Sequence, residues 1–167
     1  DKVMTGKSFV APWQGGFGTT LTWKGISLAA QFSWVADRWV FNNDRYLDEG
    51  NGLFETYNQS RRLLYDRWKK PGDVTDIPRY GVTPQMDSRF LEDASFLRLK
   101  NLMLSYNFPQ ALLKKTNFLT HLRVFVQGQN LLTFTKFSGL DPEGVSNMYQ
   151  AQYPSTRQFT FGLEVSF

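Results

Sequence analysis

Residues 157–167 alternate between apolar and polar side chains without an error. Apolar residues hold every odd position from Phe159 to Phe167, and polar residues or glycine hold the even positions. This period of two predicts a β-strand with one apolar and one polar face. The run is as long as a tilted strand that crosses a bilayer, whereas soluble strands are mostly about 5–6 residues long. It therefore indicates the closing strand of an outer-membrane β-barrel, with a long edge strand of a soluble sandwich as the alternative.

Similar alternation predicts four earlier strands. Runs at 16–24 and 26–41 flank a tight turn at Gly25, which is typical of a β-hairpin. Two more runs cover 95–108 and 121–136. The apolar phase reverses near Lys100, which predicts a β-bulge or an exit from the membrane at that point. Phe125 and Leu131 break the alternation of the fourth run.

The segments between these strands alternate between short and long. Residues 42–91 and 137–156 are polar and rich in turn-forming residues, and they predict long loops. Within the first loop we expect a short helix near 55–69, ended by Pro71 and Gly72. One side of this helix would carry Tyr57, Leu64, Tyr65 and Trp68. One or two further helical turns are expected at 110–115. If the C-terminus is periplasmic, both long loops are extracellular, as is usual in outer-membrane barrels.

Five strands cannot close a barrel. Single-chain bacterial barrels have even strand numbers from eight upward, and an open sheet edge is not stable in lipid. We therefore expect an all-β, antiparallel segment of a larger transmembrane barrel that cannot close alone. Residues 1–4 contain no apolar signal-peptide core, so either a signal has been removed or the sequence begins inside a larger protein.

The composition agrees with alternating strands and narrows the possible chemistry. The chain has 15 Phe, 7 Tyr and 5 Trp residues but no Cys, and its formal net charge is +4. Without cysteine, a disulfide, a thiolate nucleophile and a cysteine metal site are all excluded. No catalytic constellation is evident, so we expect neither an enzyme nor a cofactor. The single histidine, His121, is more simply a solvated turn residue than a metal ligand. Asp141 and Glu143 flank a proline in a turn and lack the ligand spacing of a calcium loop.

A cluster of cationic and aromatic residues in the first long loop is the main candidate binding site. Aromatic faces stack on sugar rings or peptide side chains, and guanidinium groups hold carboxylates or amides. The cluster could contact cargo, contact a lid protein, or simply pack the loop onto itself. Nucleic acid is disfavoured, because the positive charge is confined to one loop while the strands alternate as a barrel wall does. The candidate contact residues are Tyr65, Arg67, Trp68, Arg79 and Tyr80.

The strands also carry residues suited to a lumen and to membrane interfaces. The expected lumen-facing side chains are Gln31, Gln127, Gln129, Gln158, Thr160 and Glu164. The candidate aromatic-girdle residues are Trp23, Trp34, Tyr106, Phe108 and Phe134.

Several stretches, in order, resemble the SusC/RagA family of TonB-dependent outer-membrane transporters. They are Asp93–Asn101 leading into Leu104–Pro109, then Leu122–Val126, Gly128–Thr135, Gly139–Pro142 and Phe159–Phe167. Arg67-Trp68 with Pro71, followed by Ile77-Pro78-Arg79, also looks like this family. The resemblance is strong over about 93–167 and looser over 13–92.

The resemblance implies a 22-stranded barrel in the outer membrane, with a plug and a TonB-contacting segment in an N-terminal part that is not in this chain. It further implies a SusD-like surface lipoprotein as partner and an oligosaccharide or peptide as cargo. Phe167 stands where family members carry the terminal aromatic residue that the barrel-assembly machinery is thought to recognise. The alternative from another class is a soluble β-sandwich that binds carbohydrate.

Overall fold

The computed structural model describes residues 3–54, 56–116, 118–144 and 146–167, and it divides into two compact units. The sheet unit comprises residues 13–36, 96–135 and 154–167. The loop unit comprises the N-terminal residues to Pro12, residues 37–95 and residues 136–153. Each unit is described here by itself.

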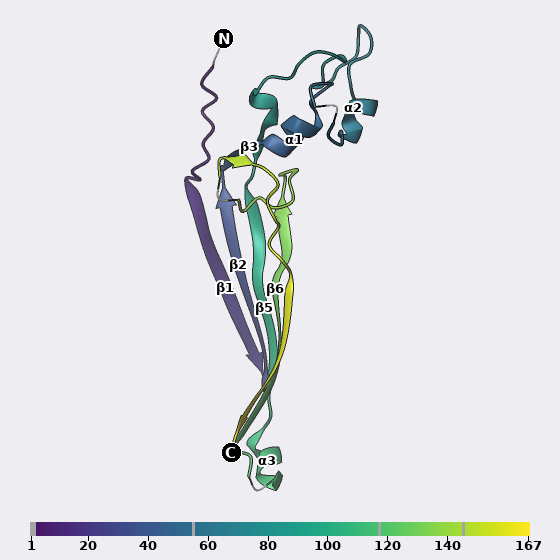
Figure 1. Ribbon diagram of the computed structural model, residues 1–167. Helices are drawn as coiled ribbons and strands as arrows, with labels where there is room; N and C mark the ends of the chain where they lie inside the picture. Colours follow the sequence, from purple (N-terminus) through teal and green to yellow (C-terminus); the bar gives the residue numbers. More distant parts are fainter. Residues whose placement is uncertain (1–2, 55, 117, 145) are drawn as a thin grey trace. The chain divides into compact units, whose positions relative to one another are not determined.

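The sheet unit is one five-stranded antiparallel sheet (Figure 1). Its strands, in spatial order, are β1 (Trp13–Trp23), β2 (Ile26–Ala36), β5 (Phe96–Asn107), β6 (His121–Thr135) and β8 (Gln158–Ser166). The β1–β2 turn uses Lys24 and Gly25, both with positive φ (46° and 88°), as a tight hairpin turn with the twist of its strands requires. β1 begins at Trp13, three residues before the start of the strand predicted at 16–24.

The connection from β5 to β6 contains the short helix expected at 110–115. It consists of α3 (Gln110–Leu113) followed by the 3₁₀ turn η2 (Lys114–Thr116). In Figure 1, α3 and the C-terminus lie at the same end of the sheet.

The β-bulge predicted near Lys100 is confirmed. Lys100 is left out of the pairing with both neighbouring strands, since Leu99 pairs with Leu132 and Asn101 pairs with Gln129. The extra residue brings Leu97 and Leu99 onto the same face as Leu102 and Leu104, although their positions in the sequence have opposite parity. The bulge therefore preserves a continuous apolar face.

The exception to alternation at Phe125 is explained by a glycine on the next strand. Phe125 points to the polar face and lies opposite Gly162. A Cβ atom placed on Gly162 would lie 2.1 Å from Cζ of Phe125, so the ring occupies the space that the glycine leaves open. Leu131 likewise lies where a side chain on Gly128 would project, 2.8 Å from the position of its Cβ.

The loop unit has its own small sheet and core. β3 (Trp39–Asn42) pairs antiparallel with β4 (Leu91–Asp93) and parallel with β7 (Met148–Tyr149). The other elements are α1 (Asn43–Asp48), α2 (Arg61–Tyr65) and the 3₁₀ turn η1 (Ser88–Phe90). Val40, Ala94, Phe137 and Tyr149 form a buried cluster against which Phe9 packs.

Two expectations are corrected in this unit. The strand predicted over 26–41 ends at Ala36, because Asp37 adopts a left-handed conformation (φ 56°), and β3 then begins in a different sheet. The helix expected near 55–69 is only α2, with Ser60 as its N-cap. Its buried residue is Leu63, whereas Tyr57, Leu64 and Tyr65 are exposed. Residue 55 lies outside the described residues.

Candidate functional site

The five-stranded sheet separates apolar and polar side chains between its two faces. Leu28, Leu104, Val126 and Phe161 lie in one cross-strand row of the apolar face. Within the sheet unit, the large side chains of this face are exposed: Phe161 is 78% exposed, and Phe159, Leu163, Phe17 and Leu21 are also exposed. An exposed apolar face of this extent is unfavourable in water. It is typical of a surface that contacts lipid or another protein.

Aromatic residues gather in two rows on this face. One row runs through Trp23, Ile26 and Tyr106, and the other through Trp34, Leu97 and Phe134. Ile26 and Trp34 are eight residues apart on β2, or about 26 Å along the strand, and tilt shortens the height between the rows. Two aromatic rows enclosing an apolar band of about 25 Å are typical of membrane-spanning barrels.

The polar face carries its own side-chain contacts. Gln127 Nε2 donates to Asn101 Oδ1 at 2.8 Å across β5 and β6. Arg123 forms an ion pair with Glu164 on β8 at 3.2 Å and donates to Ser105 Oγ at 3.3 Å. The polar face is thus tied together across three strands.

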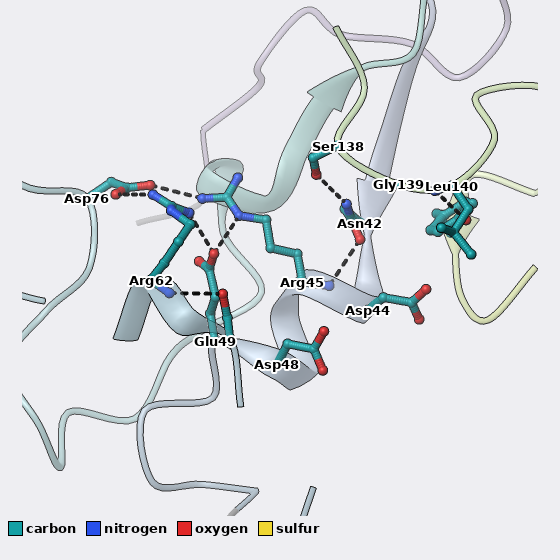
Figure 2. Close-up of a pocket in the computed structure, with 12 residues that line it drawn as sticks. Asn42, Asp44, Arg45, Asp48, Glu49, Arg62, Asp76, Ser138, Gly139 and Leu140 are labelled. Atoms are coloured by element: carbon teal, nitrogen blue, oxygen red, sulfur yellow. Dashed lines mark hydrogen bonds and ion pairs between the residues drawn. The ribbon is translucent and has the colours of Figure 1, made fainter. Parts of the chain in front are cut away.

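An ion-pair network organises the loop unit (Figure 2). Glu49, only 1% exposed, accepts through Oε1 from Arg45 Nε at 3.0 Å and from Arg62 Nη1 at 2.6 Å. The same two guanidinium groups hold Asp76, at 2.9 Å from Arg45 and 2.8 Å from Arg62. Arg45 also reaches Glu92 on β4 at 3.2 Å. We call these five residues the arginine–carboxylate network.

The network continues through Glu92 into the small sheet. Both carboxylate oxygens of Glu92 accept from Ser138, from its backbone N–H and its hydroxyl, each at 2.9 Å. Asn42 donates to Glu92 at 3.3 Å and to Ser138 at 3.0 Å. Side chains from α1, α2, β3 and β4 therefore share one set of polar contacts.

Two carboxyl groups in this part of the loop unit have pKa values shifted in opposite directions. Burial raises the pKa of Asp76, but the hydrogen bond and charge of Arg62, with the charge of Arg45, outweigh burial and hold it below its ordinary value. Burial raises the pKa of Asp48, and repulsion from Asp44 and Glu49 adds to the shift. Asp48 and Asp44 line the same open pocket of about 690 Å³ as the network, and Figure 2 shows both beside it.

The candidate contact residues chosen from the sequence are only partly brought together. The Arg67 guanidinium lies 5.3 Å from the ring centre of Tyr80, and both line a second hollow. Tyr65 instead stacks with Arg61 at 5.1 Å. Trp68 is half-buried and its backbone N–H donates to the Ile77 carbonyl at 3.0 Å, while Arg79 is exposed.

The arginine–carboxylate network was missed by the sequence analysis. The only local signal was the spacing of Arg45 and Glu49, which is i,i+4 on α1. Asp76 and Glu92 are distant in sequence and carry no local sign of their role.

Two other places that the sequence analysis considered are His121 and the turn at Asp141. His121 is the exposed first residue of β6. Glu143 N–H donates to Asp141 Oδ1 at 2.9 Å, which is the side-chain-stabilised turn that the sequence indicated. Among the described residues, no group of three or more histidine or acidic side chains is arranged to hold a metal ion. No helix within those same ranges is long and apolar enough to cross a membrane.

Comparison with known proteins gives this sheet its context. No family model matches the chain. The chain is 34% identical over 165 residues to TonB-dependent receptor P3 of Formosa agariphila, in a match covering 91% of the chain and 16% of the receptor. It is 35% identical over 87 residues to TonB-dependent receptor SusC of Bacteroides thetaiotaomicron, covering 52% of the chain and 9% of SusC. The solved structure of the RagAB peptide importer in its open-open state matches 96% of the chain at 42% identity, with a TM-score of 0.89.

The chain belongs to the SusC/RagA family of TonB-dependent receptors. It spans about a sixth of the length of the relatives that it matches. Like theirs, its sheet is part of an outer-membrane β-barrel, which explains both the exposed apolar face and the open strand edges.

The alternative of a free-standing β-sandwich is not supported. A sandwich buries the apolar faces of two sheets against each other. In the SusC/RagA segment the apolar face of the five-stranded sheet is exposed, and the matched proteins are receptors and importers.

Proposed function

We propose that the protein carrying this chain imports oligosaccharides or peptides across the outer membrane. Energy would come from TonB through a part of the protein outside this sequence. The observation that carries the proposal is the match to the RagAB peptide importer over nearly the whole chain. In this proposal the five strands are barrel wall, and residues 42–91 and 137–156 contribute to the extracellular mouth. No bond chemistry is assigned to the chain.

The proposed partner at the mouth is a SusD-like surface lipoprotein. The loop unit supports this, because it carries exposed cationic and aromatic side chains on a unit held by its own core and ion pairs. Tyr65, Arg67, Trp68, Arg79 and Tyr80 are proposed as contacts to cargo or to this lid.

The function is tested by uptake in the native bacterium. Fluorescent oligopeptides and oligosaccharides are supplied to the wild type and to a strain lacking the gene, with and without a protonophore that discharges the inner membrane. Uptake of one cargo class should require both the gene and the energised membrane. Cargo entry that is equal in all four conditions would contradict the proposal. Affinity purification of the full protein tests for the lipoprotein.

We further propose that Phe167 serves as the barrel-assembly signal. Phe167 is exposed and its ring lies 6.3 Å from that of Phe118, nearly parallel to it. Phe167→Ser should lower the amount of folded protein in the outer membrane, measured by quantitative blotting of membrane fractions. Phe118→Ser is the control, since it removes the ring contact and leaves the terminal residue. An equal loss in both variants would assign Phe167 a packing role instead.

A further inference from the structure

Four arginines of the loop unit form two contrasting pairs. Arg45 and Arg62 are neutralised by carboxylates in the arginine–carboxylate network. Arg61 and Arg67 make no carboxylate contact among the described residues, and each instead lies over a tyrosine ring. A guanidinium stacked through its face keeps its edge N–H groups available for an incoming acceptor.

Arg61 and Arg67 line the same hollow, which holds about 440 Å³. No acidic side chain is among its described lining residues. The buried side chain of Leu63 and the exposed one of Leu64 give it an apolar surface. Tyr80 packs close to Gly52, where an added Cβ would lie 3.3 Å from the ring and where φ is +98°. Glycine therefore lets the ring close one side of the hollow.

Asn51 is a buried residue of the lining. It is 2% exposed, and its Nδ2 donates to the carbonyls of Arg79 at 2.6 Å and Val82 at 3.0 Å. These two bonds set the orientation of the amide, and within the described chain its Oδ1 receives no hydrogen bond. The amide of Asn51 therefore fixes the backbone on either side of Tyr80, the ring that lines the hollow.

We propose that this hollow binds a carboxylate group on the cargo. Arg61 and Arg67 hold the carboxylate, and Tyr80 and Leu64 contact the adjoining apolar part. The required chemistry is a carboxylate beside an apolar part, which an acidic peptide and a uronic-acid oligosaccharide can both present. The inference rests on the proposed import function and narrows the cargo to its anionic members.

The test measures equilibrium binding by calorimetry on the purified full-length protein. The probes are pentaglutamate with pentaglutamine as its neutral match, and trigalacturonate with its methyl ester. Arg61→Gln and Arg67→Gln should each weaken binding of an acidic probe about tenfold, as expected for one lost charge-assisted hydrogen bond. Binding of the neutral match should be unchanged. Lys70→Gln, which removes an exposed cation outside the hollow, is the matched control and should leave both affinities within about twofold.

The outcomes separate the possible ligands. An effect confined to pentaglutamate identifies peptide cargo, and one confined to trigalacturonate identifies uronate cargo. The proposal fails if neither acidic probe binds the wild type, or if acidic and neutral probes lose affinity equally. It also fails if the variants bind both probes normally but no longer co-purify with the lipoprotein, because the hollow is then a protein-docking surface.

Two further measurements keep this test independent of folding and of the import function. Arg67→Lys retains the charge but not the planar fork, so it should bind the acidic probe with intermediate affinity. It replaces Arg67→Gln in the test if the Arg67→Gln protein does not fold into the outer membrane. Energy-dependent uptake by the wild type, measured against the strain lacking the gene, tests the import function separately. Energy-dependent uptake by the wild type, alongside acidic-probe binding that Arg61→Gln and Arg67→Gln leave unaltered, would overturn the carboxylate site while leaving the import function standing.

Discussion

Single residues decide how the polar face of the sheet is filled. Phe125 would be out of place on that face if its neighbour had a side chain, but Gly162 leaves room for the ring. Aromatic residues over glycine on an adjacent strand cover exposed backbone and pin the register of the two strands.

Gly162→Val should therefore destabilise the barrel by about 1–3 kcal/mol, the usual cost of overpacking a filled site. The measurement is the temperature at which the full-length protein loses its compact mobility on a gel. Adding Phe125→Ala to Gly162→Val should recover much of the loss, because the crowding partner is then gone. Thr160→Val, on the same strand and face, is the control for simply adding a β-branched apolar residue. Additive losses in the double variant would contradict the packing of these two residues.

At the scale of elements, the arginine–carboxylate network holds α1, α2 and β4 of the loop unit together. Arg45 is its centre, because it contacts Glu49, Asp76 and Glu92. Glu49 is almost fully buried, so losing one of its two arginines leaves Arg62 as its only ion-pair partner among the described residues.

Arg45→Ala should weaken local stability of residues 42–92 by about 1.5–3 kcal/mol, the range for a lost hydrogen bond to a charged group, because Arg62 still pairs with Glu49. Hydrogen exchange of the full-length protein, followed by mass spectrometry, should show faster exchange over these residues and unchanged exchange in β5 and β6. Lys70→Ala removes an exposed cation and should change neither region. Unaltered protection in the Arg45→Ala protein would show that the network is not what holds these elements.

The network should also loosen in acid. The pKa of Asp76 is depressed in the folded protein, so its contribution to stability is present above about pH 4 and is lost as the pH falls through the lower folded pKa. Exchange protection of residues 42–92, corrected for intrinsic rates, should fall between pH 5 and pH 3.

Two variants test the sign of this effect. Asp76→Asn should be less protected at pH 6 and should lose less on acidification. The pKa of Asp48 is raised, so its charge is unfavourable in the folded state, and Asp48→Asn should be at least as well protected at pH 6 as the wild type. An acid-dependent loss of the same size in Asp76→Asn would exclude Asp76 as its source.

For the whole molecule, the main expectation is that the two faces of the sheet meet different surroundings. Phe161 and Thr160 are neighbours in β8 and point to opposite faces. The chain has no cysteine, which makes single-cysteine reporters in this segment simple to place.

A fluorophore on Phe161→Cys in liposomes should be quenched by brominated acyl chains, and one on Thr160→Cys by aqueous iodide. The experiment uses the full-length protein with other cysteines removed. Equal quenching of both positions by the same agent would contradict a barrel wall with lipid on one side and a polar lumen on the other.

Much of the sheet could be predicted from the sequence because strand alternation is a local property. Each side chain points to the opposite face from its neighbour, so the apolar positions of residues 157–167 identify their face without any knowledge of the partner strand. The bulge at Lys100 was predictable for the same reason, since a reversal of phase must be absorbed within one strand. Five strands alone do not give the size of the barrel. The expectation of a 22-stranded barrel came from the resemblance to the SusC/RagA family, which rests on several short motifs in the same order.

The side-chain contacts of the loop unit could not be predicted from the sequence, because they depend on the tertiary structure. Glu49, Asp76 and Glu92 meet at Arg45 because chain segments far apart in sequence fold back on β3, and no periodicity records such a meeting. The separation of Arg61 and Arg67 from Arg45 and Arg62 is of the same kind. All four look alike in the sequence, and only the positions of the carboxylates decide which are neutralised. The sequence by itself thus determined the strands and their faces, while the fold alone decided which loop charges remain available to a ligand.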